Sequence, residues 1–189
     1  MDRILETERL FLRKIQQDDF PAICVILQNE TVMYAWEHTF TTDEVKAWIA
    51  ENIARYDRDG FSYWAAIEKA TNALLGVAGI MLEDVDGENY VGIGYIFNNA
   101  YWHRGFAFEA ASACLNYAFD VLKIAEITAQ IRPTNASSIS IAEKLGMTVM
   151  RSFVRKYRGK DIPHLLYCRC QDRKILSEAI PENMFGELK

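Results

Sequence analysis

The sequence predicts a single α/β domain in which helices flank a central mixed sheet. The 189 residues, half of them hydrophobic, suffice for one domain with a sheet covered on both faces. Segments with alternating hydrophobic residues are interspersed with segments of helical spacing, which is typical of a mixed α/β chain. Turn residues separate the short strands, and no repeat, low-complexity stretch or linker divides the sequence. One domain over residues 1–171 is therefore expected, followed by a tail, residues 172–189, that would form at most one short helix.

Local signals place each element in order. The second helix shows the reasoning: Thr41 or Thr42 can cap it, because Asp43 and Glu44 put negative charge in its first turn, and Gly60 ends it. In the middle of the chain, short alternating runs end at turn residues and predict strands. The expected elements are strand 10–15, helix 18–27, helix 41–60, strands 61–68, 74–82 and 90–97, helix 105–122, strand 126–132, helix 135–145, and strands 147–157 and 164–169.

Charge and hydropathy exclude some classes of function. The net charge of −5 argues against a nucleic-acid partner, which usually meets a concentrated basic face, and the basic stretch 151–160 is interpreted as a solvated strand edge and turn. No apolar run approaches the roughly 20 residues that a membrane helix requires. We therefore expect a cytoplasmic protein with neither a nucleic-acid nor a membrane partner.

The four cysteines do not predict a metal site. Cys24 and Cys114 fall on the apolar faces of expected helices, where a free cysteine acts as a small hydrophobic residue. Cys168 and Cys170 are close in sequence, but no C-x-x-C pair and no histidine-rich spacing accompanies them. No metal is expected.

Residues 95–107 carry the first chemical signal. A strand ends there, a short loop follows, and Gly105 and Ala107 lie in the opening turn of a helix. The first amides of a helix have no internal acceptor and point outward at the positive end of the helix dipole, so they can hold a pyrophosphate. His103 and Arg104 would add donors and charge. An ordinary helix start with small residues for packing explains this stretch equally well when it is taken alone.

A second stretch, N-A-S-S-I-S-I-A-E-K-L-G-M at residues 135–147, changes that balance. Together with G-Y-I-F-N-N-A-Y-W-H-R-G-F-A-F-E-A at residues 94–110, it resembles the GCN5-related N-acetyltransferase (GNAT) superfamily, and within it the RimJ/RimL-type branch of ribosomal-protein N-terminal alanine acetyltransferases. The opening T-E-R-L-F-L-R also fits that branch. The resemblance covers about Thr7 to Cys170 and implies a mostly antiparallel twisted sheet that splays open at the cofactor-binding strand.

The resemblance implies acetyl-CoA as the acyl donor and names the residues that would hold it. The strand backbone before the loop pairs with pantetheine in such enzymes, and the loop and helix start hold the pyrophosphate. Trp102 stands where the family usually has Arg or Gln, which puts that side-chain contact in doubt. Asn135 would reach the pantetheine arm. The residues implied for the cofactor are Ile96, Phe97, Asn98, His103, Arg104, Gly105, Phe106, Ala107, Asn135 and Ser138.

The reaction implied is direct attack of a primary amine, on a protein N-terminus or a small molecule, on the thioester in a ternary complex. The amine must lose a proton to a base, and the developing oxyanion needs a donor such as a backbone N–H near Ile96 or Phe97. Many relatives carry a glutamate where this chain has Gly92 and a tyrosine where it has Ala142. Glu83 is therefore interpreted as the base and Ser138 as the acid. Weaker candidates for these chemical roles are Glu37, His38 and Tyr157.

Competing functions stay open at this point. A non-catalytic acyl-CoA-binding or regulatory module would keep the phosphate site without the glutamate and the tyrosine. A nucleotide-phosphate site of another fold is disfavoured, because no G-K-[ST] or G-x-G-x-x-G motif is present. A strand edge near residues 165–170 would permit a homodimer, and Trp36 would suit a hydrophobic acceptor pocket, whereas Trp48 and Trp64 are expected in the core.

Overall fold

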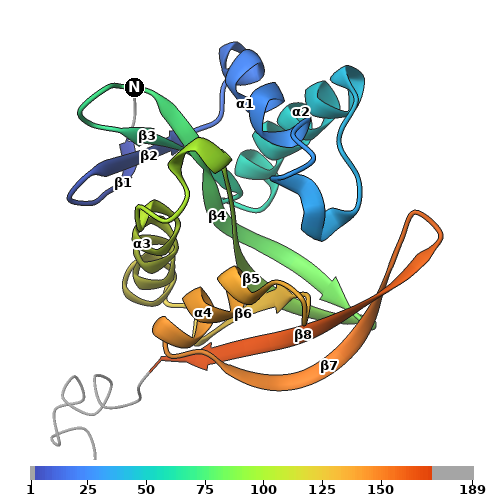
Figure 1. Cartoon of the computed structure of the whole chain (residues 1–189). Helices are drawn as coiled ribbons and strands as arrows, with labels where there is room; N and C mark the ends of the chain where they lie inside the picture. The colour runs from blue at the N-terminus through green and yellow to red at the C-terminus, as the bar shows by residue number, and fades with distance from the viewer. Residues whose placement is uncertain (1–2, 172–189) are drawn as a thin grey trace, which may run out of the picture.

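The computed structural model describes residues 3–171 (Figure 1), so the predicted tail, residues 172–189, lies outside the described residues. The strands are β1 (Arg3–Glu6), β2 (Leu10–Lys14), β3 (Tyr63–Glu68), β4 (Leu74–Val85), β5 (Glu88–Phe97), β6 (Glu126–Ile131), β7 (Thr148–Tyr157) and β8 (Lys160–Cys170). The helices are α1 (Phe20–Leu27), α2 (Thr42–Arg58), α3 (Phe106–Asp120) and α4 (Ala136–Lys144), with 3-10 turns η1 (Gln17–Asp19), η2 (Met33–Trp36) and η3 (Asn99–Tyr101).

The strands form one mixed sheet in the order β1-β2-β3-β4-β5-β6-β8-β7. Every neighbouring pair is antiparallel except β5 and β6, which are parallel and share only the pair Gly92 and Thr128. Beyond that pair the two strands diverge, whereas the antiparallel contact of β5 with β4 runs along its whole length. The expected mixed, mostly antiparallel sheet that splays at one strand is confirmed.

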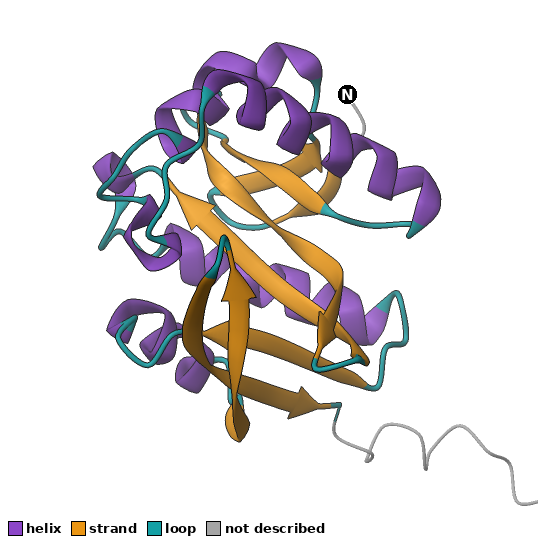
Figure 2. Ribbon diagram, turned by 90° about the vertical axis from the view of Figure 1, so that its right-hand side faces the viewer, coloured by secondary structure: helices purple, strands orange, loops and turns teal. Residues whose placement is uncertain are grey.

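Helices cover both faces of the sheet (Figure 2). Strand β3 explains why, because successive side chains of a strand point to opposite faces. Trp64 and Ala66 pack into the core on the side of α3, while Ala65 and Ile67 pack into the core under α1 and α2. Both faces of this central strand are therefore apolar.

Local chemistry fixes the helix ends. Thr41 caps α2: its hydroxyl accepts a bond of 3.3 Å from the Glu44 N–H, and the Glu44 carboxylate accepts one of 2.8 Å from the Thr41 N–H. Ahead of α1, the buried Asp19 carboxylate accepts two bonds of 2.7 Å from the Arg13 guanidinium. Within residues 3–171, no helix has the length and apolar character that crossing a membrane requires.

Three sequence expectations about the strands need correction. The sequence predicted no strand before residue 10, yet β1 pairs with β2; a four-residue strand is too short to show alternation. Strand β8 begins at Lys160, four residues earlier than expected. The strand edge expected near residues 165–170 is wrong, because β8 pairs with β6 and with β7. The edge is β7, which exposes Val149, Met150 and Val154, and homodimer formation stays a prediction.

Candidate active site

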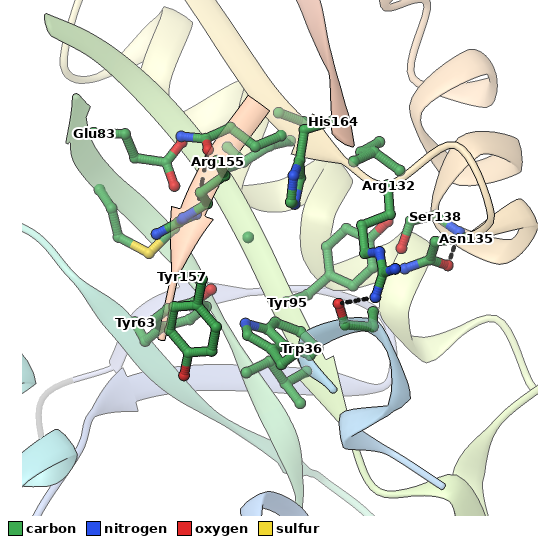
Figure 3. Close-up of a pocket in the computed structure, with 18 of the residues that line it drawn as sticks. Trp36, Tyr63, Glu83, Tyr95, Arg132, Asn135, Ser138, Arg155, Tyr157 and His164 are labelled. Carbon is green, nitrogen blue, oxygen red and sulfur yellow. Dashed lines mark hydrogen bonds between the residues drawn. The ribbon is translucent and has the colours of Figure 1, made fainter. Parts of the chain in front are cut away.

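A cavity of about 520 Å³ opens where β5 and β6 diverge (Figure 3). Its floor comes from the two strands that separate, and its walls come from the ends of β4, β7 and β8 and from the segment between α1 and α2. Polar and aromatic side chains therefore converge on it from parts of the chain far apart in sequence. Those labelled in Figure 3 are Trp36, Tyr63, Glu83, Tyr95, Arg132, Asn135, Ser138, Arg155, Tyr157 and His164.

Alternate residues of β5 turn their backbone groups toward this gap. The Asn98 N–H donates to the Leu75 carbonyl of β4 over 2.9 Å. Because bonding direction alternates along an antiparallel strand, Ile96 and Asn98 face β4, whereas Tyr95 and Phe97 face the gap. The Trp102 indole Nε1 donates to the Phe97 carbonyl over 2.8 Å. Trp102 thus braces the end of β5.

The residue that precedes α3 provides no side-chain cap for the first amides of the helix. This residue is Gly105, with φ 81° and ψ 0°, a left-handed conformation that glycine adopts without strain. His103 is also left-handed, and both His103 and Arg104 are exposed. The side chain of Phe106 is only 2% exposed and packs into the core, so this residue presents backbone rather than side chain to the loop.

Arg9, which the sequence interpretation missed, holds this loop in place. Its Nη1 donates to the Arg104 carbonyl over 2.9 Å, and its Nε donates to the Glu109 carboxylate over 2.7 Å. Its guanidinium carbon also lies 4.4 Å from the centre of the Phe106 ring. The arginine of the T-E-R-L motif was visible in the sequence, but nothing in its spacing indicated a contact 95 residues away.

The start of α4 is capped, in contrast to that of α3. The Asn135 Oδ1 accepts bonds of 3.1 Å from the Ser138 N–H and 2.8 Å from the Tyr34 hydroxyl. The Ser138 side chain lies at the cavity beside Tyr95. Burial raises the pKa of Tyr95 to about 12, with the Ser138 hydroxyl acting in the opposite direction. The Tyr95 hydroxyl is therefore protonated throughout the neutral range.

Glu83 occupies the space above Gly92. A Cβ at Gly92 would lie 2.3 Å from Glu83 Oε2, so the carboxylate of β4 lies where a side chain from β5 would begin. Glu83 Oε2 is buried without a hydrogen-bond partner among the described residues. Burial raises the pKa of this carboxyl, opposed by Gln130 and by the charge of Arg155. A glutamate is thus present near the place where relatives carry one, although it comes from the neighbouring strand.

Aromatic side chains line one part of the cavity. Trp36 lies there as expected, and Trp64 is in the core, only 2% exposed. Trp48 was predicted to be a core residue, but it lines the cavity and packs against Tyr63 with ring centres 5.5 Å apart. The hydroxyl of Tyr63 lies over Gly94, 2.4 Å from the position that a Cβ would take there. Helical spacing shows that a side chain faces inward, but it does not distinguish a packed core from a cavity wall.

Two of the weaker catalytic candidates contact other charged side chains. The Glu37 carboxylate accepts from Lys160 over 3.0 Å and from Arg132 over 2.7 Å, and these bonds lower its pKa. His38 Nε2 lies 3.1 Å from the Glu44 carboxylate. Neither side chain is part of the cavity wall formed by residues 3–171. Tyr157 does line it.

The remaining predictions from the sequence fall outside the cavity. Ala142, at the position of the family tyrosine, is 2% exposed and packs in the core. Cys114 is buried in the core and Cys24 is half-buried. The side chains of Glu126, Cys168 and Cys170 lie close together on β6 and β8, with their ligand atoms within 4.8 Å of one another. Burial and Glu126 raise the pKa of the Cys168 thiol to about 12.

The structure therefore brings one group of predicted residues to the cavity and another to the start of α3. Ile96, Asn135, Ser138 and Glu83 line the cavity. His103, Arg104, Gly105, Phe106 and Ala107 surround the start of α3, and Phe97 and Asn98 lie between the two groups along the chain. The sequence interpretation missed Tyr95, Arg132, Arg155 and His164, which reach the cavity only because β5, β6, β7 and β8 adjoin it.

The structure thus combines a splayed sheet, an uncapped helix start and a polar cavity. Comparisons with known proteins identify the class of protein to which this arrangement belongs, which is an acetyltransferase. The model of the acetyltransferase (GNAT) domain family matches residues 9–148. YnaD of Bacillus subtilis (strain 168), described as an uncharacterized N-acetyltransferase, is 31% identical over 144 residues, 76% of this chain and 81% of YnaD. The chain belongs to the GNAT acetyltransferase family.

Solved structures agree with that assignment. A GNAT-family acetyltransferase from Bacillus anthracis superimposes with a TM-score of 0.75 at 27% identity, covering 88% of this chain and 97% of the other. RimL, a ribosomal L7/L12 alpha-N-protein acetyltransferase solved in complex with coenzyme A, gives a TM-score of 0.74 at 18% identity over 89% of this chain and 98% of RimL. This second likeness concerns the fold alone.

Proposed function

We propose that this chain transfers an acetyl group from acetyl-CoA to a primary amine, on a peptide N-terminus or a small molecule. The observation that carries the proposal is the combination of two features: the uncapped amides at the start of α3, and the gap between β5 and β6 at the polar cavity. The complex of RimL with coenzyme A, on the same fold, supports this choice of donor.

The residues present fit such a donor. The pyrophosphate would be held by main-chain amides beyond Gly105, where the left-handed glycine leaves no side chain in the way. His103 and Arg104 are exposed next to these amides. The pantetheine arm would run along β5, where the groups of Tyr95 and Phe97 face the gap. When bound, the donor supplies a thioester, whose carbonyl carbon is open to attack by an amine.

On the acceptor side we place Glu83 opposite the amine nitrogen. An amine is mostly a cation at neutral pH, with a pKa of about 8 for an α-amine and about 10 for a lysine. The buried Glu83 carboxylate, unpartnered on Oε2 among the described residues, offers the opposite charge next to the aromatic walls of Trp36 and Tyr63. Within residues 3–171, the carboxylate and imidazole side chains of the cavity are those of Glu83, Asp84 and His164.

On the donor side we propose that Ser138 passes a proton to the departing thiolate. The reaction forms a C–N bond and breaks the C–S bond, and the nitrogen of the ammonium form loses two protons in total. One proton leaves before attack to a base, and the other ends on sulfur. Ser138 is held at the cavity by the capped start of α4, and the Tyr95 hydroxyl lies beside it as a second source of a proton.

The test is release of free thiol from acetyl-CoA in the presence of a panel of primary amines. Steady release that depends on the amine supports the enzyme, with an amine-free reaction as the control for hydrolysis. Binding of coenzyme A by calorimetry without turnover on any amine would favour a non-catalytic acyl-CoA-binding module. The absence of both binding and turnover would contradict the proposal.

A further inference from the structure

His164 presents an unprotonated ring nitrogen to the cavity. Its Nδ1 lies 2.9 Å from the Ile162 carbonyl oxygen, which can only accept a hydrogen bond, so Nδ1 carries the proton. In the neutral ring the proton is then absent from Nε2, which keeps a free lone pair. Figure 3 shows the ring pointing into the cavity between Arg155 and Arg132.

The surroundings of His164 keep this ring neutral and fixed. The ring packs against Phe153 with centres 5.5 Å apart. Burial lowers the pKa of His164, and the charges of Arg155 and Arg132 act in the same direction. The charged and titratable side chains that share the cavity with it are Arg55 of α2, Tyr63 of β3, Glu83 and Asp84 of β4, Tyr95 of β5, Arg132 after β6, and Arg155 and Tyr157 of β7.

We propose that His164, through Nε2, accepts the proton that the acceptor amine must lose before it attacks. This inference rests on the proposed function and assigns to a residue outside the predicted site the step that activates the nucleophile. The ammonium gives one proton to Nε2, its freed lone pair forms the C–N bond, and the imidazolium later releases the proton to solvent. Glu83 then serves as the counter-charge that holds the ammonium form.

His164 suits this step better than Glu83 does for a physical reason. A general base must be unprotonated when the amine arrives, and it must then return the proton to solvent. An imidazole whose pKa is lowered from 6.5 is neutral at pH 7, so its Nε2 lone pair is available. The Glu83 Oε2 is enclosed by protein, whereas the ring of His164 is half-buried and can exchange with solvent.

The experiment compares the pH dependence of acetyl transfer in the wild-type protein and in His164→Gln. The wild type is expected to lose kcat/KM as pH falls through an inflection below 6.5. In His164→Gln, kcat should fall about 10²- to 10⁴-fold with KM for the amine little changed, and that inflection should vanish. His38→Gln is the matched control, because His38 pairs with Glu44 outside the cavity, and it should keep the wild-type profile.

A second measurement tests the tautomer without turnover. Nitrogen-15 NMR of the ring should show Nδ1 protonated and Nε2 unprotonated at about pH 7, with titration below 6.5. The opposite tautomer, or a His164→Gln variant with wild-type kcat and the same acid inflection, would overturn the inference while leaving the proposed function intact. A wild type without turnover on any amine would overturn both.

Discussion

Two strand-to-helix units flank the cavity, and they are built in opposite ways. The β5–α3 unit removes side chains: Gly92 and Gly94 lie on the strand, and Gly105 precedes the helix. The β6–α4 unit instead supplies side chains to the cavity, namely those of Arg132, Asn135 and Ser138. Under the proposed function, the first unit would offer backbone to the donor, and the second would offer functional groups.

The two helix starts show this difference most directly. At α3 the preceding residue has no side chain to cap the first turn, whereas at α4 the Asn135 oxygen already accepts two bonds. Helices usually satisfy their first amides with a cap, so an uncapped start beside a gap in a sheet indicates where a ligand completes the bonding. The comparison predicts that added side chains will damage the first unit more than truncated side chains damage the second.

The largest effect is expected from Gly105→Glu. A carboxylate at this position would meet the negative pyrophosphate and fill the space that the glycine leaves open, so affinity for coenzyme A should fall by at least about 100-fold. Calorimetric titration with coenzyme A measures it.

Gly60→Glu is the matched control for backbone strain. Gly60 has nearly the same φ, 83° against 81°, and no heavy atom lies within 4 Å of the position that a Cβ would take there, but it follows α2 rather than preceding α3. Both variants should lose about 1 kcal/mol of stability from the left-handed backbone. Equal affinity for coenzyme A in the two variants would show that the pyrophosphate does not lie at the start of α3.

The next effect concerns Glu83 and the glycine beneath it. Glu83→Gln removes the charge that holds an ammonium, and we expect kcat/KM to fall about 10- to 100-fold, mainly through KM. Gly92→Ala should reproduce part of this loss, because the new Cβ would begin 2.3 Å from Glu83 Oε2 and displace the carboxylate. Amine saturation curves at fixed acetyl-CoA check both, and an unchanged KM in both variants would remove Glu83 from the acceptor site.

Glu83→Gln should also be more stable than the wild type at neutral pH. Since the pKa of Glu83 is raised in the folded state, the folded protein binds this proton more tightly than the unfolded chain does. The protonated carboxyl therefore contributes stability at pH values below its ordinary pKa of 4.5. This contribution is lost as the pH rises through the pKa of Glu83 in the folded protein. Thermal unfolding should show a higher melting temperature for the variant at about pH 7 and a smaller difference near pH 4.

The sequence predicted the backbone part of this site better than the side-chain part. Gly105, Asn135 and Ser138 lie in contiguous motifs, and their places follow from where a strand ends and a helix begins. Glu83 was named because it ends the neighbouring strand, but its position over Gly92 depends on the register of β4 and β5, in which Met81 pairs with Gly92. Register is a property of the folded sheet, so no local pattern reveals it.

The sequence could not place His164 and Arg155 at the cavity for a related reason. Both come from the β7–β8 hairpin, and they face the cavity because the parallel pair of β5 and β6 places β8 next to the gap. The sequence predicted both strands and their turn. It contained no signal for their order in the sheet, because the order is set by packing among segments far apart along the chain.

A smaller effect is expected from Ser138→Ala. The hydroxyl is lost, but the backbone N–H that bonds to Asn135 remains, so stability and affinity for coenzyme A should change little. We expect kcat to fall about 10-fold, less than the usual contribution of an acid, because the neighbouring Tyr95 hydroxyl can donate in its place. Combining Ser138→Ala with Tyr95→Phe should give a larger loss than either change alone. Full activity in the double variant would exclude both hydroxyls from proton delivery.

The smallest effect is expected from Asn135→Ala, which removes the cap of α4. Loss of a helix cap costs about 1 kcal/mol, which corresponds to a fall of roughly 2–4 °C in melting temperature for a chain of this size. Tyr34→Phe removes only the second bond to the same oxygen and leaves the cap, so its melting temperature should fall less. If Asn135 also contacts the donor, Asn135→Ala will weaken coenzyme A binding several-fold while Tyr34→Phe will not. Equal affinities for coenzyme A in the two variants would show that Asn135 acts only as a helix cap. The start of α4 would then be bonded within the protein, whereas the start of α3 would bond to the donor.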